Sequence, residues 1–336
     1  MKGVAAPGSS APPVLLDIND LTIEFPTANG PARAVDRLNL TVLQGEVVGL
    51  VGESGCGKSM TALSVLRLVP PPGRVTGGRI RLEGDDLLSL PGHVMHTIRG
   101  RRIAMIFQEP MTALNPVLTV GHQIAEMLRL HLGLSRSDAK AKTVELLRLV
   151  GIPSPDKRWG EYPHQLSGGM RQRVMIAMAI SCDPDLIFAD EPTTALDVTV
   201  QAQILDLLAG LRERLGTAMV LISHNLGVIA QVAQSVAVMY AGRIVEHAET
   251  TRLFADPRHP YTRGLLASLP RLDAGGRPRR LNAIAGNVPP LGAVQRGCRF
   301  ADRCPLVITR CTEEEPPLET TSPGHRTRCW LVEPQA

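Results

Sequence analysis

The stretch Gly52-Glu-Ser-Gly-Cys-Gly-Lys58-Ser59 fits the pattern G-x-x-x-x-G-K-[ST] and decides the fold. It lies between residues 46–51, an apolar run typical of a buried strand, and residues 60–69, which are typical of a helix. A glycine-rich turn between a strand and a helix directs backbone N–H groups and a helix N-terminus at one point, which favours an anion. We therefore predict a nucleoside triphosphate site in which Lys58 reaches the β- and γ-phosphates and the Ser59 hydroxyl holds Mg²⁺.

The composition of the 336-residue chain suits a folded protein of about two domains. Hydrophobic residues make up 44% and charged residues 20%, which argues against wholesale disorder. No uninterrupted apolar run reaches the ~18 residues that span a bilayer, and the first residues lack the apolar segment of a signal peptide. We expect a disordered leader over residues 1–13 and a cytoplasmic protein that meets a membrane only through a partner. The net charge of +4 gives no indication of nucleic-acid binding.

The rest of the chain divides into an antiparallel, a helical and a parallel region. Alternating apolar residues over 14–41 and a turn-rich stretch over 73–90 predict hairpins. Apolar residues at helical spacing over 120–150 predict helices, and strand, helix and strand alternate over 181–240. Right-handed crossovers of this last kind give a parallel sheet. From Asp256 onward the sequence is rich in Pro and Cys without a clear period, so we place a boundary between residues 255 and 256.

A second set of candidate residues follows an apolar run at 185–189, which is typical of a buried strand and ends in Asp190 and Glu191. A strand of this kind presents its last side chains at the carboxyl edge of the sheet, where open α/β sheets bind ligands. We predict that Asp190 holds Mg²⁺ through water and that Glu191 polarises the attacking water as a general base. The alternative is that both carboxylates only cap a helix.

Two further features need a role. The stretch Leu166-Ser-Gly-Gly-Met170 opens a helix and forms another N-terminus suited to an anion, although one phosphate loop already surrounds the phosphates of one nucleotide. Phe25 precedes the phosphate loop and is either a core residue or a surface on which a purine stacks; its sequence context alone favours the core.

Taken together, the motifs resemble those of the ATP-binding-cassette (ABC) ATPases over about residues 15–250. The matching motifs are the phosphate loop, Gln108, residues 166–170, Asp190-Glu191, Ala195-Leu-Asp197 and Ser223-His224, in that order. The resemblance implies an α/β fold of the P-loop NTPase class: a RecA-like parallel sheet core, an antiparallel β subdomain and an α-helical signature subdomain. The cassette would occupy residues 14–255, and residues 256–336 would form a short Cys-rich C-terminal extension.

The resemblance also assigns roles. Two cassettes pair head to tail, so that ATP lies between the phosphate loop of one and the Ser167 segment of the other. Gln108 links Mg²⁺ and the attacking water to the transmembrane contact, and His224 contacts the γ-phosphate and orients Glu191. Phe25 would stack on adenine, which reverses the preference for a core role, and Asp197 would lie at the dimer interface. The expected catalytic residues are Glu191, His224 and Gln108; the expected ATP contacts are Phe25, Gly52, Ser54, Gly55, Cys56, Gly57, Lys58, Ser59, Met60, Gln108, Ser167, Gly168, Gly169, Asp197 and His224; the expected Mg²⁺ ligands are Ser59, Gln108 and Asp190.

Within the family, residues 105–116 (MIFQEPMTALNP), residues 162–173 (YPHQLSGGMRQR) and the tail with His259-Pro-Tyr-Thr262 resemble the ATPases of bacterial dipeptide, oligopeptide and nickel importers. This implies a homologous second ATPase subunit, two permease subunits and an extracytoplasmic peptide-binding protein, with the chain peripheral at the cytoplasmic face of the inner membrane. The alternatives are a nickel or other small-solute importer, a soluble ABC ATPase that acts on DNA or ribosomes, and an iron–sulfur module driven by the cassette.

The tail contains the pattern Cys298-x₅-Cys304-x₆-Cys311-x₁₇-Cys329. Zinc sites usually have a closer pair of cysteines, ferredoxin runs have other spacings, and disulfides are disfavoured in a reducing cytoplasm. On spacing alone, the alternative that the four thiols bind no metal therefore remains open. A tail this poor in apolar residues needs another source of folding energy, which a metal centre can supply. Cys-rich tails in the peptide-importer branch are associated with a [4Fe–4S] cluster, so we expect one here, with Zn²⁺ as the alternative.

Overall fold

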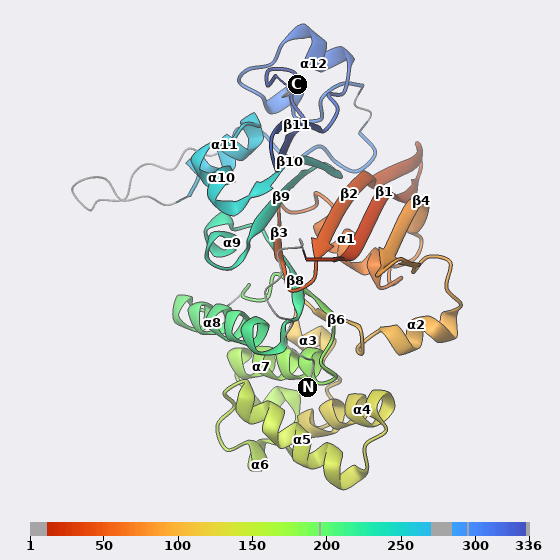
Figure 1. Ribbon diagram of the computed structural model, residues 1–336, viewed down its shortest axis with the longest axis vertical. Helices are drawn as coiled ribbons and strands as arrows, with labels where there is room; N and C mark the ends of the chain where they lie inside the picture. The colour runs from red at the N-terminus through yellow and green to blue at the C-terminus, as the bar shows by residue number, and fades with distance from the viewer. Residues whose placement is uncertain (1–11, 195, 270–283, 294–295, 334–336) are drawn as a thin grey trace, which may run out of the picture.

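The computed structural model describes residues 12–194, 196–269, 284–293 and 296–333. Its strands form two sheets, one of four strands and one of eight. Figure 1 shows a helical region at one end of the molecule, the C-terminal segment at the other, and the sheets between them. Most of the predicted leader lies outside the described residues, as does Ala195.

The four-stranded sheet is antiparallel. Its order is β2 (Gly30–Leu43), β1 (Val14–Thr27), β4 (Arg74–Leu82), β5 (Asp85–Asp86). Strand β1 pairs with β2 as a hairpin on one side and with β4 on the other. Leu16, Ile18 and Ile23 of β1 are fully buried, whereas the polar residues between them are more open. The two hairpins predicted from alternation and turn residues are thus confirmed.

The eight-stranded sheet is parallel except at one edge, where its strands are antiparallel. Its order is β11 (Glu319–Ser322), β12 (His325–Thr327), β10 (Arg243–Glu249), β9 (Ser235–Tyr240), β3 (Val47–Val51), β8 (Ala218–Ser223), β7 (Leu186–Asp190), β6 (Ile103–Ile106). Strand β3 pairs in parallel with β8 and β9, and β7 pairs in parallel with β6 and β8. The side chains of Val47 and Val51 join one hydrophobic cluster and those of Val48 and Leu50 another. Because the sheet is covered on both faces, its central strands are apolar throughout, as the sequence predicted.

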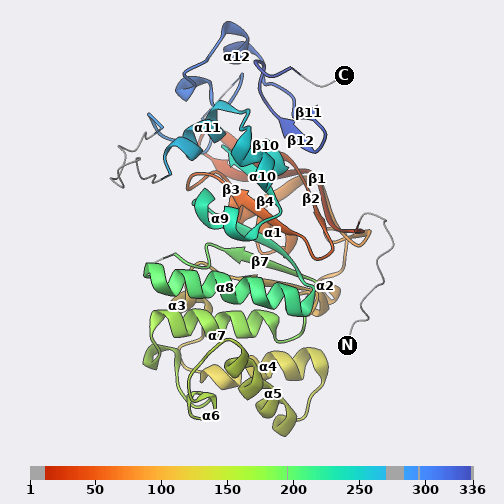
Figure 2. The same cartoon turned by 60° about the vertical axis from the view of Figure 1, so that its left-hand side comes forward.

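Helices cover the sheet and form the signature region. They are α1 (Lys58–Val65), α2 (Gly92–Ile98), α3 (Pro110–Ala113), α4 (Val120–Leu132), α5 (Arg136–Leu149), α6 (Pro155–Arg158), α7 (Gly168–Ile180), α8 (Val198–Leu215), α9 (Leu226–Val232), α10 (Thr250–Ala255), α11 (Pro260–Ala267) and α12 (Thr309–Glu313). Figure 2 shows α7 and α8 side by side above α4, α5 and α6. The Thr119 hydroxyl caps α4 and the Ser135 hydroxyl caps α5, which fixes the start of each. Among the described residues, no helix combines the length and the apolar character needed to cross a bilayer.

The C-terminal segment pairs with the central sheet and packs into the same hydrophobic core. Strand β12 pairs with β10 and so extends the central sheet, and β11 pairs with β12. Tyr261 of α11 and Phe300 are buried in the same hydrophobic cluster as the parallel strands. The rings of Tyr261 and Phe300 lie 4.7 and 5.2 Å from the Tyr240 ring. The boundary between residues 255 and 256 therefore stays a prediction, and extensive packing crosses it.

Candidate nucleotide-binding site

The phosphate loop joins the end of β3 to the start of α1, as the sequence predicted. A Cβ atom at Gly52 would lie 2.1 Å from the carbonyl oxygen of Met239, and Gly57 has a φ of 108°, so glycine is needed at both ends of the loop. The buried Lys58 ammonium donates to the carbonyl oxygens of Gly52 at 2.7 Å and Glu53 at 3.0 Å. Through these contacts the Lys58 side chain folds back over the loop whose bound phosphates it is predicted to contact.

The sites of the other predicted loop contacts differ in exposure. Ser54 and Gly55 are exposed, and a Cβ at Gly55 would meet open space, so this part of the loop is accessible to a ligand. Cys56 is completely buried, and burial raises the pKa of its thiol. A nucleotide can therefore meet Cys56 only through its backbone, and the thiol is shielded from alkylating reagents. Ser59 and Met60 are partly buried at the start of α1.

Asp190 ends β7 beside the loop. Its side chain is only 5% exposed, and this burial raises the pKa of the carboxyl group, while a hydrogen bond from Ser59 and the charge of Lys58 oppose the rise. The oxygen Oδ1 of Asp190 is buried without a hydrogen-bond partner among the described residues. A buried carboxylate oxygen without a partner is costly. Asp190 and Ser59 together thus offer the hard oxygen ligands that Mg²⁺ prefers.

Glu191 gathers three polar side chains. Its Oε1 lies 3.1 Å from Nδ1 of His224, and its Oε2 accepts hydrogen bonds from Gln108 at 3.2 Å and from Thr194 at 2.8 Å. Gln108 follows β6 and His224 follows β8, so adjacent strand ends deliver the three predicted residues to one point. Thr194 was not predicted; its only signal in the sequence is a hydroxyl three residues after the carboxylate.

The electrostatics keep Glu191 ionised. Burial alone raises the pKa of its carboxyl group, but the hydrogen bonds from Thr194 and His224 and the charges of His224 and Lys58 more than offset this, so the pKa lies below its ordinary value. Glu191 also has a φ of 45°, in the left-handed region that is uncommon for residues other than glycine. A strained, ionised carboxylate at a strand end suits a general base.

Residues 166–170 and Asp197 lie at the starts of helices α7 and α8. The Ser167 hydroxyl accepts a hydrogen bond from the N–H of Met170 and begins α7, and Asp197 accepts one from the N–H of Val200 and begins α8. A Cβ at Gly169 would come within 2.9 Å of Val200, so glycine lets the two helix starts approach closely. Ser167, Gly168 and Asp197 are exposed. Among the described residues, no hydrogen bond joins this face to residues 52–59.

Phe25 lies near the end of β1 and is partly buried. A Cβ at Gly73 would lie 2.5 Å from Cζ of Phe25, so the glycine gives the ring a close-packed surface. This packing leaves adenine stacking a prediction.

Comparison with known proteins fixes the family. Residues 35–194 match the ABC transporter family, and residues 245–311 match the family described as oligopeptide/dipeptide transporter, C-terminal region. The chain is 53% identical over 318 residues to the probable peptide ABC transporter ATP-binding protein y4tR of Sinorhizobium fredii, which covers 94% of this chain and 95% of that protein. This chain belongs to the ABC transporter family.

Other similar proteins support the assignment to the ABC transporter family. The oligopeptide transport ATP-binding protein OppD of Bacillus subtilis is 49% identical over 323 residues, covering 96% of this chain and 90% of that protein. Among solved structures, the ATP-binding cassette MJ0796, a dimer in a post-hydrolysis state with ADP and Pi, has a TM-score of 0.64 at 26% identity and covers 70% of this chain and 99% of that chain. The predicted α/β cassette fold is therefore confirmed.

The four tail cysteines of this ABC protein converge. Cys298, Cys304, Cys311 and Cys329 line one cavity together with His259 and Phe300. The N–H of Cys298 donates to the carbonyl oxygen of Cys311 at 2.7 Å, and burial raises the pKa of Cys298 to about 11. His325, which the sequence places near these cysteines, instead lies 2.7 Å from Glu246, and both side chains are completely buried.

The convergence does not amount to a metal site as it stands. The cavity has a volume of about 10 Å³, which is room for about one water molecule. Among the described residues, no group of three His, Cys, Asp or Glu side chains has the geometry to hold a metal ion. Four thiols are a suitable donor set for iron–sulfur or zinc chemistry, but their side chains would have to rearrange. The four cysteines thus share one location, but their side chains do not have the geometry of ligands to a [4Fe–4S] cluster or Zn²⁺, so either group stays a prediction.

Proposed function

We propose that this chain is the ATP-hydrolysing subunit of an importer of di- or oligopeptides that acts through separate permease subunits. The observation that carries the proposal is the contact of Gln108, Thr194 and His224 with Glu191 beside the phosphate loop. The peptide cargo is proposed because relatives that match nearly the whole chain are named peptide or oligopeptide transport ATP-binding proteins. Nickel or another small solute is the alternative, since this subunit would not touch the cargo.

Hydrolysis follows from the arrangement of these residues. Lys58 and the loop N–H groups bind the β- and γ-phosphates, and Asp190 with Ser59 would hold Mg²⁺, which neutralises phosphate charge when bound. Glu191 accepts a proton from the attacking water, and His224, Thr194 and Gln108 keep its carboxylate oriented. Catalysis here depends on positioning and charge stabilisation, because phosphoryl transfer needs little covalent help.

We further propose a head-to-tail pair with a homologous second ATPase subunit. Ser167 and Gly168 are exposed at the N-terminus of a 13-residue helix, where N–H groups favour a phosphate. Val198, beside Asp197, is 83% exposed, so an apolar side chain is available to a partner next to this helix start. This face would cover the ATP bound at the phosphate loop of the second subunit, and the corresponding face of the second subunit would complete the site of this chain.

The permease contact is proposed at the junction of the sheet and the helical region. A cavity of about 190 Å³ there is lined mainly by apolar side chains, including Met105, Phe107 and Met178. Phe107 and Met111 are 38% and 51% exposed. Gln108 follows Phe107 directly and contacts Glu191, so an occupant of this groove would be linked to the catalytic carboxylate. The chain would then lie peripherally at the cytoplasmic face of the inner membrane, with the extracytoplasmic binding protein reached only through the permeases.

The experiment that tests this function is reconstitution of the chain with its permeases in liposomes. We expect ATP hydrolysis and uptake of labelled peptide that both disappear in Lys58→Ala, whereas the control Lys142→Ala, an exposed residue of α5, keeps both. Stable association of the purified chain with ribosomes or DNA instead of permeases would contradict an importer. Uptake of nickel without uptake of peptide would select the alternative cargo.

For the tail, we propose that Cys298, Cys304, Cys311 and Cys329 ligate a [4Fe–4S] cluster, with Zn²⁺ as the alternative. What supports this is that four thiols line a single cavity in a segment with few apolar residues. Anaerobic purification with metal and labile-sulfide analysis tests it. Iron and sulfide lost in Cys304→Ser would support the cluster, stoichiometric zinc would select the alternative, and metal-free protein would refute both.

A further inference from the structure

A seven-residue segment of the tail, residues 298–304, contacts the start of the phosphate loop directly and its other end through the turn between β9 and β10. At the loop's first residues, the Arg303 guanidinium forms a two-pronged ion pair with Glu53: Nη1 lies 2.7 Å from Oε2 and Nη2 lies 3.0 Å from Oε1. Glu53 directly follows Gly52, and the Arg303 side chain is only 4% exposed. A bidentate pair between arginine and a carboxylate, shielded in this way, fixes the geometry of both groups.

Arg303 is itself held rigidly. Its Nε donates to the carbonyl oxygen of Ala285 at 2.9 Å, and the guanidinium lies over the rings of Tyr240 and Phe300, 5.7 and 5.9 Å from their centres. The hydrogen bonds to Glu53 raise the pKa of Arg303 above its already high value, so its charge is permanent. The anchor of the loop is therefore a preorganised, permanently charged group.

The backbone of Glu53 has a second tail partner. Its N–H donates to the hydroxyl oxygen of Tyr261 at 2.9 Å, and Tyr261 is completely buried in α11. Lys58 also contacts this part of the loop through the Gly52 and Glu53 carbonyls. When Lys58 donates to a phosphate, fewer of its hydrogens remain for those carbonyls. Arg303 and Tyr261 then carry most of the restraint on the loop's first residues.

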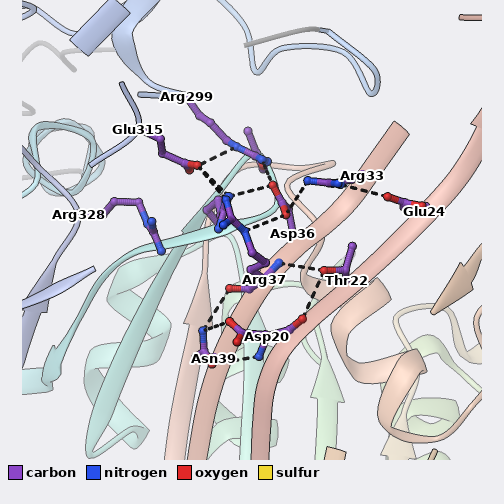
Figure 3. A network of polar contacts seen from close by, with 12 residues as sticks. Asp20, Thr22, Glu24, Arg33, Asp36, Arg37, Asn39, Arg299, Glu315 and Arg328 are labelled. Atoms are coloured by element: carbon purple, nitrogen blue, oxygen red, sulfur yellow. Dashed lines mark hydrogen bonds and ion pairs between the residues drawn. The ribbon is translucent and has the colours of Figure 1, made fainter. Parts of the chain in front are cut away.

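The other end of the loop is held through the turn between β9 and β10. The carbonyl oxygen of Cys56 accepts from the N–H of Gly242 at 2.9 Å, and the carbonyl oxygen of Gly242 accepts from the N–H of Asp36 at 2.9 Å. Arg299 donates both to the carbonyl oxygen of Ala241 and to the carboxylate of Asp36. Figure 3 shows Arg299 reaching down from the tail to Asp36, which also meets the buried Arg243.

We propose that Arg303 is a positioning residue for the phosphate loop: by fixing Glu53, it holds the loop in the shape that receives a triphosphate. The C-terminal segment is then part of the ATP site without touching the nucleotide. This inference rests on the proposed ATP hydrolysis. Because Arg303 acts on the loop and not on Glu191, its loss should weaken ATP binding more than the chemical step.

Glu53→Gln and Arg303→Met are the decisive variants. Glu53→Gln keeps the size of the side chain and leaves the packing of Arg303 in place. Hydrogen bonds to charged groups are the stronger kind, so we expect each variant to raise the KM for ATP about tenfold while kcat changes by less than about twofold. The double variant should be no worse than either single one, because both remove the same interaction. Arg310→Met, at an exposed tail arginine paired with Glu314, is the matched control and should leave KM unchanged.

The measurements are steady-state ATP hydrolysis, nucleotide binding by titration calorimetry, and thermal melting. A raised KM and Kd in Glu53→Gln with an unchanged melting temperature supports positioning. A lowered melting temperature with unchanged KM and Kd shows a purely structural pair and overturns the inference, as does additivity in the double variant. Wild-type protein that neither binds nor hydrolyses ATP would instead refute the proposed function, which is a separate result.

Discussion

Replacing Glu191 by Gln gives the sharpest test of the proposed chemistry. The amide keeps the shape of the side chain and its oxygen can still accept from Thr194, which lies 2.8 Å from the carboxylate. It loses the negative charge and with it the ability to take a proton from water. General bases contribute about 10²- to 10⁴-fold to a rate, so we expect kcat to fall at least about a hundredfold with the Kd for ATP within about threefold of wild type.

The pKa of Glu191 adds a second expectation. Because the pKa is lowered below the ordinary value of 4.5, the carboxylate stays ionised as the pH falls from 8 to 6. The base is active when deprotonated, so its contribution is lost only when the pH falls through this lowered pKa. Glu191 should therefore add no acid limb to the pH–rate profile above about pH 5.

The assay is release of phosphate at saturating ATP, with ATP affinity measured separately. Glu213→Gln, an exposed carboxylate of α8, is the matched control and should behave as wild type. Residual hydrolysis above about a tenth of the wild-type rate in Glu191→Gln would refute the assignment of Glu191 as the base, because the proton of the attacking water would then go to another group.

Two further predictions concern stability. In Asp36→Asn, the Arg243 guanidinium, 3% exposed and 3.0 Å from Asp36, loses a buried counter-charge; we expect a loss of about 3 kcal/mol in urea unfolding, and a loss under about 1 kcal/mol would contradict this. His247, whose ring accepts from Arg326, has its pKa lowered to about 4 by burial. The neutral ring stabilises the fold above the unfolded-state pKa of about 6.5, and this contribution is lost as pH falls from 6.5 to 4. Since the side chain is partly open, we expect the free energy of unfolding to fall by about 1–2 kcal/mol over this pH range, and by less in His247→Gln. An identical pH dependence of unfolding in both proteins would show that His247 does not titrate as described.

The sequence signals that predict the nucleotide site are local. The phosphate loop needs only a strand, a glycine turn and a helix in succession, and each is encoded within a few residues. Asp190, Glu191 and His224 stand at the ends of apolar strands, and a parallel sheet brings such ends to one edge regardless of loop detail. The roles of Gln108, His224 and Phe25, by contrast, came from the family resemblance.

The contacts between the tail and the loop could not be predicted, for a physical reason. Arg303 and Glu53 are 250 positions apart, and their pairing depends on how an aperiodic segment packs against the sheet. Strands β11 and β12 are short and polar, so no alternation marks them as part of the central sheet. The Cys spacing likewise indicated a cluster of side chains but not their geometry, which depends on backbone turns that the spacing does not encode.

Removing residues 256–336 tests whether the cassette is independent of this tail. Glu246 of β10 is completely buried and accepts from the N–H groups of Arg258 and His259 at 2.7 and 3.0 Å, besides its contact with His325. Truncation removes all three partners and the two rings packed on Tyr240. Buried charges without partners cost several kcal/mol, so we expect residues 1–255 to be insoluble or to melt at least about 10 °C lower. A truncated protein that melts at the same temperature as the full-length chain and binds ATP equally well would show that the tail is dispensable. It would also show that the phosphate loop does not need the restraint by Arg303.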